Sequence, residues 1–360
     1  MQLRDKNILI ISPEDWGDCW LSKHHYAQIL ADRGNRVFFL GPCLWREKPT
    51  PSDGVTLLSE PKSPRGLRFL PRLVRDAAHR KIRQELEKEA GTSFDLVWSF
   101  DPSRFMSVNR LTSGLSIFFL ADKTEQLPWK LAAASADLCL GCSTEILQLL
   151  KSVNPNTMFV NHGYLKRETF PYDFETPAPR AVYAGNLAFS ILDHERILRL
   201  VREYPSVHFH FFGDTGTGNL GRGEECELVK KLREYPNAHI KGSVSPHVLA
   251  SVYESADVLL LFYDPFTEYV VENSHKMMEY LGSGTPILTT RIREYDKIST
   301  LLEVHDDPDP YCQALGKILQ NNDQSLARQR IEFAEQNTYH AHLKRIETAL
   351  TETLHSRVQK

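Results

Sequence analysis

The chain has 360 residues, of which 25% are charged and 41% hydrophobic, an ordinary globular composition that suggests two domains. A formal net charge of −3 predicts no nucleic-acid partner. No stretch approaches the roughly eighteen apolar residues of a membrane span, and the N-terminus enters a strand without a signal-peptide pattern, so we expect a cytoplasmic protein.

Six cysteines lie at positions 19, 43, 139, 142, 226 and 312, and their spacing is not that of a small disulfide-linked domain. Cys139 and Cys142 spell C-x-x-C at the end of a predicted strand, with no second cysteine pair. We interpret them as two small core residues rather than as a redox or zinc site.

The chain opens with a predicted strand at 7–12, a helix at 22–33 and a strand at 36–40, which is a βαβ unit. The loop PEDWGDCWL follows the first strand, at the edge of a parallel sheet where open α/β folds bind ligands. Its tryptophans and acids are groups that stack on sugar rings and bind hydroxyls. An alternative stays open, in which the tryptophans only pack and the histidines that follow lie on a helix surface.

Residues 61–83 carry eight Lys or Arg against one Asp, with Leu67, Phe69, Leu70 and Leu73 among them. This pattern has two interpretations. It is typical of the solvated face of a helix, and also of a basic amphipathic surface attracted to anionic lipid or to an anionic acceptor.

Strands predicted at 95–99, 116–121, 137–141 and 157–161 complete a doubly wound sheet in the first half. Each is followed by a polar residue: these are Asp101, Asp122, Ser143 and His162. Since the carboxyl ends of parallel strands share one edge of a sheet, these residues predict a ligand cleft there.

Residues 170–180 contain three prolines and no periodicity, which is typical of an interdomain linker. A second α/β pattern follows: its predicted strands are 181–184, 207–212, 238–241, 258–262 and 287–289. The tail, 324–358, reads as polar helix with a break at 337–338.

Glycines 216, 218 and 221 spell G-x-G-x-x-G, the fingerprint of a dinucleotide site. A true fingerprint needs an acid at the end of the next strand, and here that strand ends in Lys241 and Gly242. We therefore disfavour a dehydrogenase.

The stretch 272–290 predicts a short helix opened by Asn273 and Ser274 and closed by Gly282, followed at once by a strand. Lys276 and Glu279 lie three residues apart and share one side of the helix. A helix N-terminus with a lysine can bind a diphosphate, and a carboxylate can accept hydrogen bonds from a ribose. The alternative is a capped helix with a surface Lys–Glu pair.

The sequence S-H-K-M-M-E-Y-L-G-S-G-T-P-I-L at 274–288 resembles the donor-binding helix of family 4 glycosyltransferases, which have the GT-B fold. The resemblance implies that Glu279 holds the ribose of a nucleoside-diphosphate sugar and that the first turn holds the diphosphate. Many members carry a second glutamate eight residues before the one that matches Glu279. Here that position is Val271 and the nearest acid is Glu272, so the sequence does not indicate which sugar the donor carries.

Other segments resemble the same family. The loop at 162–164 is similar to its N-G-V-D loop, and residues 242–246 match the segment whose backbone reads the base. The Arg and Lys that often follow the glycine matching Gly185 are absent, which leaves His194 and Arg196 as the nearest cations. The family holds diphosphate without an obligatory metal, so we interpret HDDPDP at 305–310 as a helix N-cap.

We therefore predict two Rossmann-like doubly wound α/β domains facing each other across a cleft, the GT-B fold. The domains are 1–170 for the acceptor, a linker at 171–180, 181–336 for the nucleotide sugar, and a helix at 337–360 packing back toward the first domain. The function is transfer of a sugar from a UDP- or GDP-linked donor to a hydroxyl acceptor, with retention, in glycan or polysaccharide biosynthesis. The alternatives are a nucleotide-sugar epimerase of the same fold and a non-catalytic sugar-nucleotide-binding protein.

The predicted catalytic residues are Lys276, Glu279, His162 and Asp18. The predicted donor-binding residues are Gly185, Asn186, Gly213, Val244, Ser245, Glu272, Asn273, Ser274, His275, Lys276 and Glu279. The predicted acceptor-binding residues are Trp16, Lys23, His24 and Asp122. No metal or cofactor is expected besides the sugar nucleotide, and the acceptor is a glycan, a lipid-linked molecule or a small molecule. Peripheral contact with an anionic membrane, at its inner face, is part of the same expectation.

Overall fold

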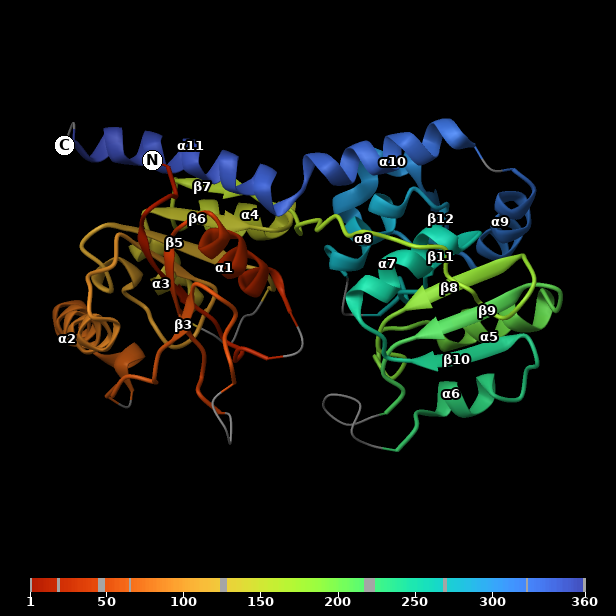
Figure 1. The fold of residues 1–360 in the computed structure, drawn as a ribbon, viewed down its shortest axis with the longest axis horizontal. Coiled ribbons are helices and arrows are strands. Elements are labelled where there is room, and N and C mark those ends of the chain that lie inside the picture. The colour runs from red at the N-terminus through yellow and green to blue at the C-terminus, as the bar shows by residue number, and fades with distance from the viewer. Residues whose placement is uncertain are drawn as a thin grey trace. The chain divides into compact units, whose positions relative to one another are not determined.

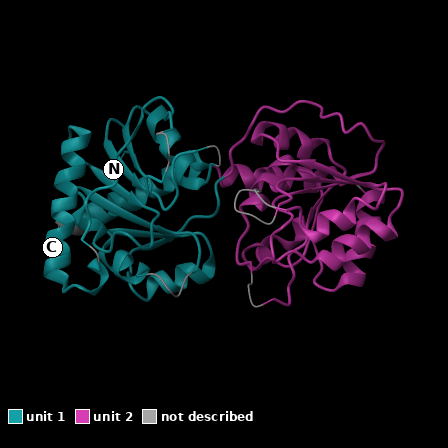
Figure 2. Ribbon diagram, turned by 90° about the horizontal axis from the view of Figure 1, so that it is seen from below, with its two compact units in different colours: residues 1–163, 339–360 teal, residues 164–338 magenta. Residues whose placement is uncertain are grey.

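The computed structural model describes residues 2–17, 20–44, 49–64, 66–123, 128–216, 224–267, 271–321 and 323–358, with the backbone alone at 356–358. The chain divides into two compact units, one of Met1–Gly163 with Tyr339–Lys360 and one of Tyr164–Thr338 (Figure 2). Each unit contains a parallel sheet surrounded by helices (Figure 1), which confirms the predicted α/β fold class.

Unit 1 has a seven-stranded sheet in the order β3-β2-β1-β4-β5-β6-β7, with every pairing parallel. The strands are β1 (Asn7–Ile11), β2 (Arg36–Leu40), β3 (Val55–Leu57), β4 (Leu96–Ser99), β5 (Leu115–Leu120), β6 (Leu138–Gly141) and β7 (Thr157–Phe159). All six residues of β5 are buried, as expected for a central parallel strand covered on both faces. The order reverses between β1 and β4, which is the doubly wound topology predicted from the sequence.

The helices of unit 1 are α1 (Ser22–Asp32), η1 (Leu67–Phe69), α2 (Arg72–Ala90), η2 (Val108–Arg110), α3 (Trp129–Ser135), α4 (Thr144–Lys151) and α11 (Tyr339–Val358). Ser143 begins α4 as its N-cap, because its Oγ accepts the backbone N–H of Ile146 at 3.2 Å. The C-terminal α11 packs against α1 and β6 (Figure 1).

Unit 2 has a six-stranded sheet in the order β10-β9-β8-β11-β12-β13, again with every pairing parallel. The strands are β8 (Arg180–Ala184), β9 (His208–Phe212), β10 (Ala238–Gly242), β11 (Val258–Leu261), β12 (Ile287–Thr289) and β13 (Glu303–Val304). The helices are α5 (His194–Glu203), α6 (Glu227–Leu232), α7 (Pro246–Ser255), α8 (His275–Ser283), η4 (Arg293–Leu301), α9 (Pro308–Gln320) and α10 (Gln324–Gln336).

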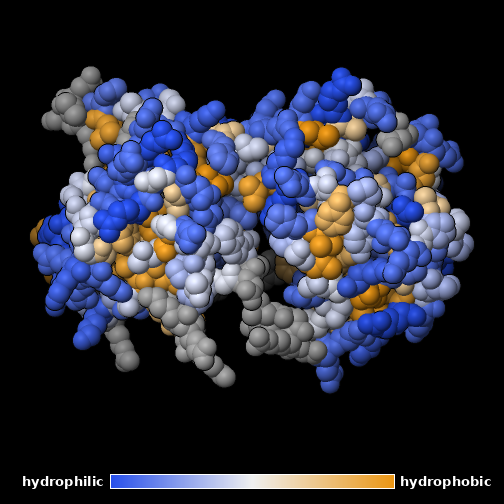
Figure 3. Space-filling view, in the orientation of Figure 1, coloured by the Kyte–Doolittle hydropathy of each residue, from blue (hydrophilic) through white to orange (hydrophobic). Residues whose placement is uncertain are grey.

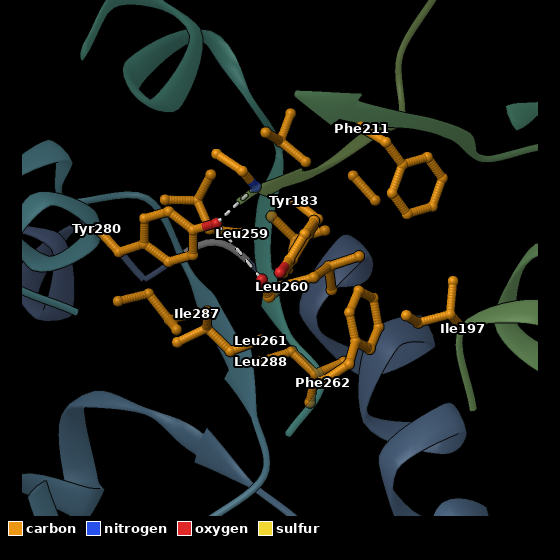
Figure 4. Close-up of a cluster of buried hydrophobic side chains, with 14 of the residues drawn as sticks. Tyr183, Ile197, Phe211, Leu259, Leu260, Leu261, Phe262, Tyr280, Ile287 and Leu288 are labelled. Atoms are coloured by element: carbon orange, nitrogen blue, oxygen red, sulfur yellow. Dashed lines mark hydrogen bonds between the residues drawn. The ribbon is translucent and has the colours of Figure 1, made fainter. Parts of the chain in front are cut away.

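The strand order of unit 2 reverses between β8 and β11, and there the two strands separate. They pair only at Ala181 with Val258 and at Val182 with Leu259. Beyond that point the hydroxyl of Tyr280, from α8, accepts the N–H of Ala184 at 3.0 Å and donates to the carbonyl of Leu260 at 3.4 Å (Figure 4). One buried side chain thus satisfies the backbone groups that the diverging strands leave unpaired.

Several local expectations need correction. Helix α8 does not end at Gly282 but at Gly284, whose φ of +76° makes it the left-handed cap. Gly282 lies inside the helix, where a Cβ would overlap the ring of Tyr164. The segment 171–180, predicted as a linker, lies within unit 2, and its Phe174 is buried against His210.

Other expectations hold. Cys139 and Cys142 are buried free thiols, and burial raises the pKa of Cys139 to about 12, so both are core residues. Asp307 is the N-cap residue of α9, although its side chain makes no capping bond. Of the predicted G-x-G-x-x-G, Gly218 and Gly221 lie outside the described residues.

Within the part of the chain that the structure describes, no helix is long and apolar enough to cross a membrane. On the face shown in Figure 3, polar side chains dominate, and apolar ones gather in small separate patches.

Candidate functional site

The candidate site lies in unit 2, at the carboxyl ends of β8 and β11, where the strand order reverses. Open α/β sheets bind ligands at this position because the loops diverge there and leave a crevice. Helix α8 begins beside it, after the segment that holds Glu272, Asn273 and Ser274. The predicted donor residues before α8 therefore lie in the neighbourhood expected from the sequence.

Ser274 is the N-cap residue of α8, but its side chain does not cap the helix. Its Oγ instead hydrogen-bonds the hydroxyl of Tyr263 at 3.0 Å, and its carbonyl accepts the hydroxyl of Tyr295 at 3.3 Å. Two buried tyrosines thus fix the start of the helix from outside it. Ser274 therefore does not cap the positive end of the helix dipole with its side chain, and such an end attracts anions.

Lys276 projects from the first turn of α8 and is partly buried. Its Nζ donates to the hydroxyl of Tyr183 at 3.5 Å and lies 5.1 Å from the centre of that ring. Burial lowers the pKa of Lys276 to about 8, although Glu279 acts in the opposite direction. Among the described residues no carboxylate pairs with this ammonium, so its charge is available to a ligand.

Two glycines bring the backbone against Lys276. A Cβ on Gly185, directly after β8, would overlap the Lys276 ammonium and come within 2.8 Å of the Tyr183 hydroxyl. A Cβ on Gly213, after β9, would overlap the carbonyl of Gly185. Both have positive φ, +155° and +132°, which glycine adopts without strain. Asn186 follows, and its Oδ1 accepts the N–H of Ala188 at 2.8 Å, which fixes the turn.

Glu279 lies one turn further along α8, in the wall of a small, partly open pocket. The residues lining it are Tyr164, Leu165, Arg167, Thr169, Pro246, Ala250, Tyr253, Glu254, Glu279 and Ser283. Burial raises the pKa of Glu279, while Arg167 and Lys276 oppose that rise. The carboxylate makes no hydrogen bond or ion pair with the described parts of the chain, so its lone pairs are available to a ligand.

Arg167 lies in the same pocket and was not predicted as a site residue. Its Nη1 donates to the carbonyl of Leu165 at 3.2 Å, whereas its Nε is buried without a partner in the described structure. Arg167 follows the loop at 162–164, so the family resemblance pointed at its neighbourhood. Its position beside Glu279 depends on the fold alone.

The predicted base-reading segment begins α7 and borders this pocket. Ser245 is the N-cap of α7, with its Oγ accepting the N–H of Val248 at 3.4 Å, and Pro246 lines the pocket. Val244 packs against the core of unit 2. The pocket therefore lies between the start of α7 and Glu279.

Two other expected cations are not equivalent to Lys276. Arg196 is buried: its guanidinium donates to Asp193 at 2.9 Å and to the carbonyls of His305 and Asp306 at 3.0 and 2.5 Å. It serves the packing of α5 and cannot also bind phosphate. His194 is partly buried at the start of α5, and burial lowers its pKa, which favours the neutral ring.

Glu272 and His275 flank this region. The carboxylate of Glu272 lies 3.7 Å from the Arg293 guanidinium, and its carbonyl accepts the N–H of Glu294 at 3.3 Å. His275 is the first residue of α8 and is exposed.

The predicted acceptor residues of unit 1 are more fully engaged with the protein than expected. Trp16 is only 5% exposed, and its ring packs edge-on against Trp20, His24 and Phe39. His24 is fully buried: its Nδ1 accepts the N–H of Leu21 at 3.1 Å and its Nε2 lies 3.1 Å from the carbonyl of Asp15. These two residues pack and position the loop, and their contact with a sugar stays a prediction.

Lys23 and Asp122 remain candidates. Lys23 is buried and forms an ion pair with Glu14. Asp122, after β5, reaches solvent; the surrounding protein raises its pKa, with Lys23 acting in the opposite direction. His162 follows β7, and burial lowers its pKa to about 4, so its imidazole is neutral near pH 7. Asp18 lies outside the described residues.

No group of three or more His, Cys, Asp or Glu side chains in the described ranges is arranged to hold a metal ion.

The fold and this site define a class of protein, and comparisons with known proteins agree with it. Sucrose-phosphate synthase from Thermosynechococcus elongatus has a TM-score of 0.70 at 14% identity, covering 98% of this chain and 100% of that one. WaaG, a glycosyltransferase involved in lipopolysaccharide biosynthesis, has a TM-score of 0.59 at 15% identity, covering 91% and 95%. At such identities the likeness establishes the fold, and the chain has the GT-B glycosyltransferase fold.

A third structure with this fold is an E. coli trehalose-6-phosphate protein bound with UDP-2-fluoro glucose, with a TM-score of 0.64 at 11% identity over 96% and 99% of the chains. Residues 193–350 match the family described as glycosyl transferase-like. No curated protein sequence matches the chain. The resemblance expected from residues 274–288 is thus confirmed in fold, and the glycosyl transferase-like family match includes those residues.

Proposed function

We propose that this protein is a glycosyltransferase that moves a sugar from a nucleoside-diphosphate sugar to a hydroxyl acceptor. The observation that carries the proposal is the pair Lys276 and Glu279 on α8. Both are partly buried charges at the switch point of a parallel sheet, and neither forms an ion pair with a described residue, although each lies in the field of the other. A buried charge without a partner destabilises a fold, so its presence in a crevice favours a ligand that completes it.

In this proposal the diphosphate lies between the start of α8, the Lys276 ammonium and the backbone at Gly185. Glu279 accepts hydrogen bonds from the ribose hydroxyls, and the base lies toward Val244 and Ser245. The bond between the anomeric carbon and the diphosphate oxygen breaks, and the departing oxygen gains negative charge. The helix dipole and Lys276 stabilise that charge without a required metal ion.

The acceptor hydroxyl then forms the new bond to the anomeric carbon, and its proton must go to a base or to the leaving diphosphate. We propose that unit 1 contributes this side of the reaction, with Asp122, Lys23 and His162 as the candidate residues. The acceptor class is a glycan, a lipid-linked molecule or a small molecule, and the setting is glycan or polysaccharide biosynthesis in the cytoplasm.

Three comparisons support the details of this proposal. One protein of the same fold was solved with a UDP-linked sugar analogue, which supports a UDP donor. Another, a trehalose-6-phosphate synthase, is described as transferring a glycosyl group with retention, which supports that stereochemistry. The family match covers 193–350, the part of the chain that holds Lys276 and Glu279.

The test is release of nucleoside diphosphate from a panel of UDP- and GDP-linked sugars, with and without chelator. We expect one donor to be hydrolysed slowly in the absence of acceptor, and release to continue in chelator. Glu279→Gln should abolish most of that release while the protein stays folded. Tight binding without turnover of any donor in the presence of acceptor extracts would instead support a non-catalytic sugar-nucleotide-binding protein. Donor conversion to an isomeric sugar would support an epimerase.

A further inference from the structure

Unit 1 carries an exposed apolar surface at the start of α2, which the proposed function does not use. Phe69 is 77% exposed, Leu73 82% and Val74 51%. The other large apolar side chains that are at least half exposed in the described ranges are Leu44, Phe170 and Phe266, and these are far apart in the sequence. We call the segment 66–75 the α2 entry surface.

The exposure of this surface follows from the way α2 packs. Its buried residues are Asp76, His79, Ile82, Leu86 and Ala90, spaced three or four apart as on one helix face. Leu73 lies three residues before Asp76 and continues that face, yet it is exposed. The first turn of α2 therefore extends beyond the protein that covers the rest of the helix.

Cations surround these apolar side chains. Arg68 and Arg72 are exposed, and the guanidinium of Arg68 lies 4.7 Å from the centre of the Phe69 ring. Asp76 is the sole acid between 61 and 83. It is buried and bound to Ser107 at 2.7 Å and to Arg110 at 3.1 Å, so it does not neutralise the surface.

We propose that the α2 entry surface docks on an anionic phospholipid bilayer. A bilayer offers negative headgroups at the depth of arginine side chains and an apolar layer directly beneath them, which matches cations flanking exposed Phe, Leu and Val. A polyanion such as nucleic acid would use the arginines but not the apolar side chains. A second protein chain would need acidic groups opposite Arg68 and Arg72.

An open groove of about 810 Å³ adjoins this surface, and it includes Leu67, Arg68 and Phe69 on one side and Ser103 and Met106 on the other. Ser103 and Met106 follow β4, so the groove lies at the carboxyl edge of the sheet of unit 1. Docking would hold this edge close to the membrane, where a lipid-linked hydroxyl acceptor is found. That last step rests on the proposed function; the docking itself does not.

The test is co-sedimentation of the full chain with vesicles of phosphatidylcholine alone and of phosphatidylcholine mixed with phosphatidylglycerol. We expect binding to the anionic vesicles only, weakening as salt is raised, because salt screens the arginines. Arg68→Gln with Arg72→Gln should lower the partition coefficient about tenfold or more. Phe69→Ser should lower it about tenfold through the lost apolar contact.

Matched controls remove the same groups elsewhere. Lys317→Gln with Arg328→Gln removes two exposed cations of unit 2, and Phe266→Ser removes an exposed phenylalanine. Both control proteins should bind anionic vesicles like the parent. Thermal unfolding and donor hydrolysis in solution should be unchanged in all variants, which separates docking from folding and from the proposed function.

Three results would overturn the proposal. The parent chain could ignore anionic vesicles at low salt, or the unit 2 controls could lose as much binding as the α2 variants. The parent could also form dimers that Phe69→Ser dissolves, which would assign the surface to a second copy of the chain.

Discussion

The two units share one architecture but treat the polar residues at their strand ends differently. In unit 1, Asp101 after β4 is buried and accepts from Ser103, from the backbone of Arg104 and from its guanidinium. His24 has both ring nitrogens engaged with backbone groups. On α8 of unit 2, Lys276 and Glu279 form no ion pair in the described structure, although they act on each other's pKa and Arg167 also acts on that of Glu279.

This difference indicates what each set of residues does. A buried polar group with all its hydrogen bonds made supports the fold, and removing it costs stability. A partly buried charge without a partner reduces stability, and it is retained where a ligand supplies the missing partner. We therefore expect Asp101 and His24 of unit 1 to support the fold, and Lys276 and Glu279 on α8 of unit 2 to serve binding.

The largest expected effect is on the stability of unit 1. Asp101→Ala removes the group that pairs with Arg104, whose Nη1 also donates to Glu60 at 2.6 Å and to the carbonyl of Gly41 at 2.9 Å. Arg104 keeps Glu60 but loses its more buried carboxylate partner, which should lower the free energy of unfolding by about 3 kcal/mol. Denaturant unfolding measures this change.

The same carboxyl predicts a pH effect. Burial by itself would raise the pKa of Asp101, but Arg104 and the N–H groups of Ser103 and Arg104 outweigh it and hold the pKa below its ordinary value. A depressed pKa contributes stability that is present above the unfolded-state pKa and is lost as pH falls through the folded-state pKa. Asp101→Ala should therefore lose less stability on acidification than the parent. Its nucleotide affinity, per folded molecule, should equal that of the parent; a large loss would mean that the two units do not differ as described.

A second change tests the opposite half of the comparison. Glu279→Gln keeps the shape of the side chain but removes the charge that strengthens hydrogen bonds to a ribose. Nucleoside affinity should fall about ten- to a hundredfold. The free energy of unfolding should stay the same or rise slightly, because a partly buried charge is removed. Calorimetric titration with nucleoside and nucleoside diphosphate measures it.

Glu254→Gln is the matched control, since Glu254 lines the same pocket but already accepts the hydroxyl of Thr169 at 2.6 Å. Its effect on nucleoside affinity should be less than about threefold. Equal losses in the two variants would show that the pocket responds to any lost carboxylate and that Glu279 has no special role.

The smallest and most specific effect concerns Lys276. Lys276→Met should weaken the binding of nucleoside diphosphate about tenfold and leave the binding of nucleoside unchanged, because in the proposed complex the ammonium faces the phosphates. Its pKa of about 8 means that the side chain is charged below that pH and becomes neutral above it. Diphosphate affinity of the parent should therefore fall between about pH 7 and pH 9, and that fall should be absent in Lys276→Met.

Lys276→Arg is the control, since arginine keeps its charge throughout this range. Its binding should not vary with pH. A pH dependence that persists in both variants would assign the titration to another group.

Much of the fold could be predicted from the sequence because its signals are local. Apolar runs bounded by polar residues placed β2 and β12 with the bounds observed, and the other long strands within one or two residues. No strand was predicted at β3 or β13, which are the short outer strands of the two sheets. The end of α8 was misplaced because Gly282 and Gly284 are both possible left-handed caps, and the sequence pattern does not distinguish them.

The sequence by itself determined the parallel α/β pattern and the helix with Lys276 and Glu279 on one side, because both depend on spacing along the chain. Only the tertiary structure decided which charged and aromatic groups remain available. Arg196 and Lys276 are both cations near the switch point, but Arg196 is bound by carbonyls more than a hundred residues away, at His305 and Asp306. The ring of Trp16 likewise packs against Phe39, which lies on β2. Arg167 and Glu279, more than a hundred residues apart, line one pocket. Hydrogen-bond partners and burial come from residues distant in sequence, so no local pattern can specify them.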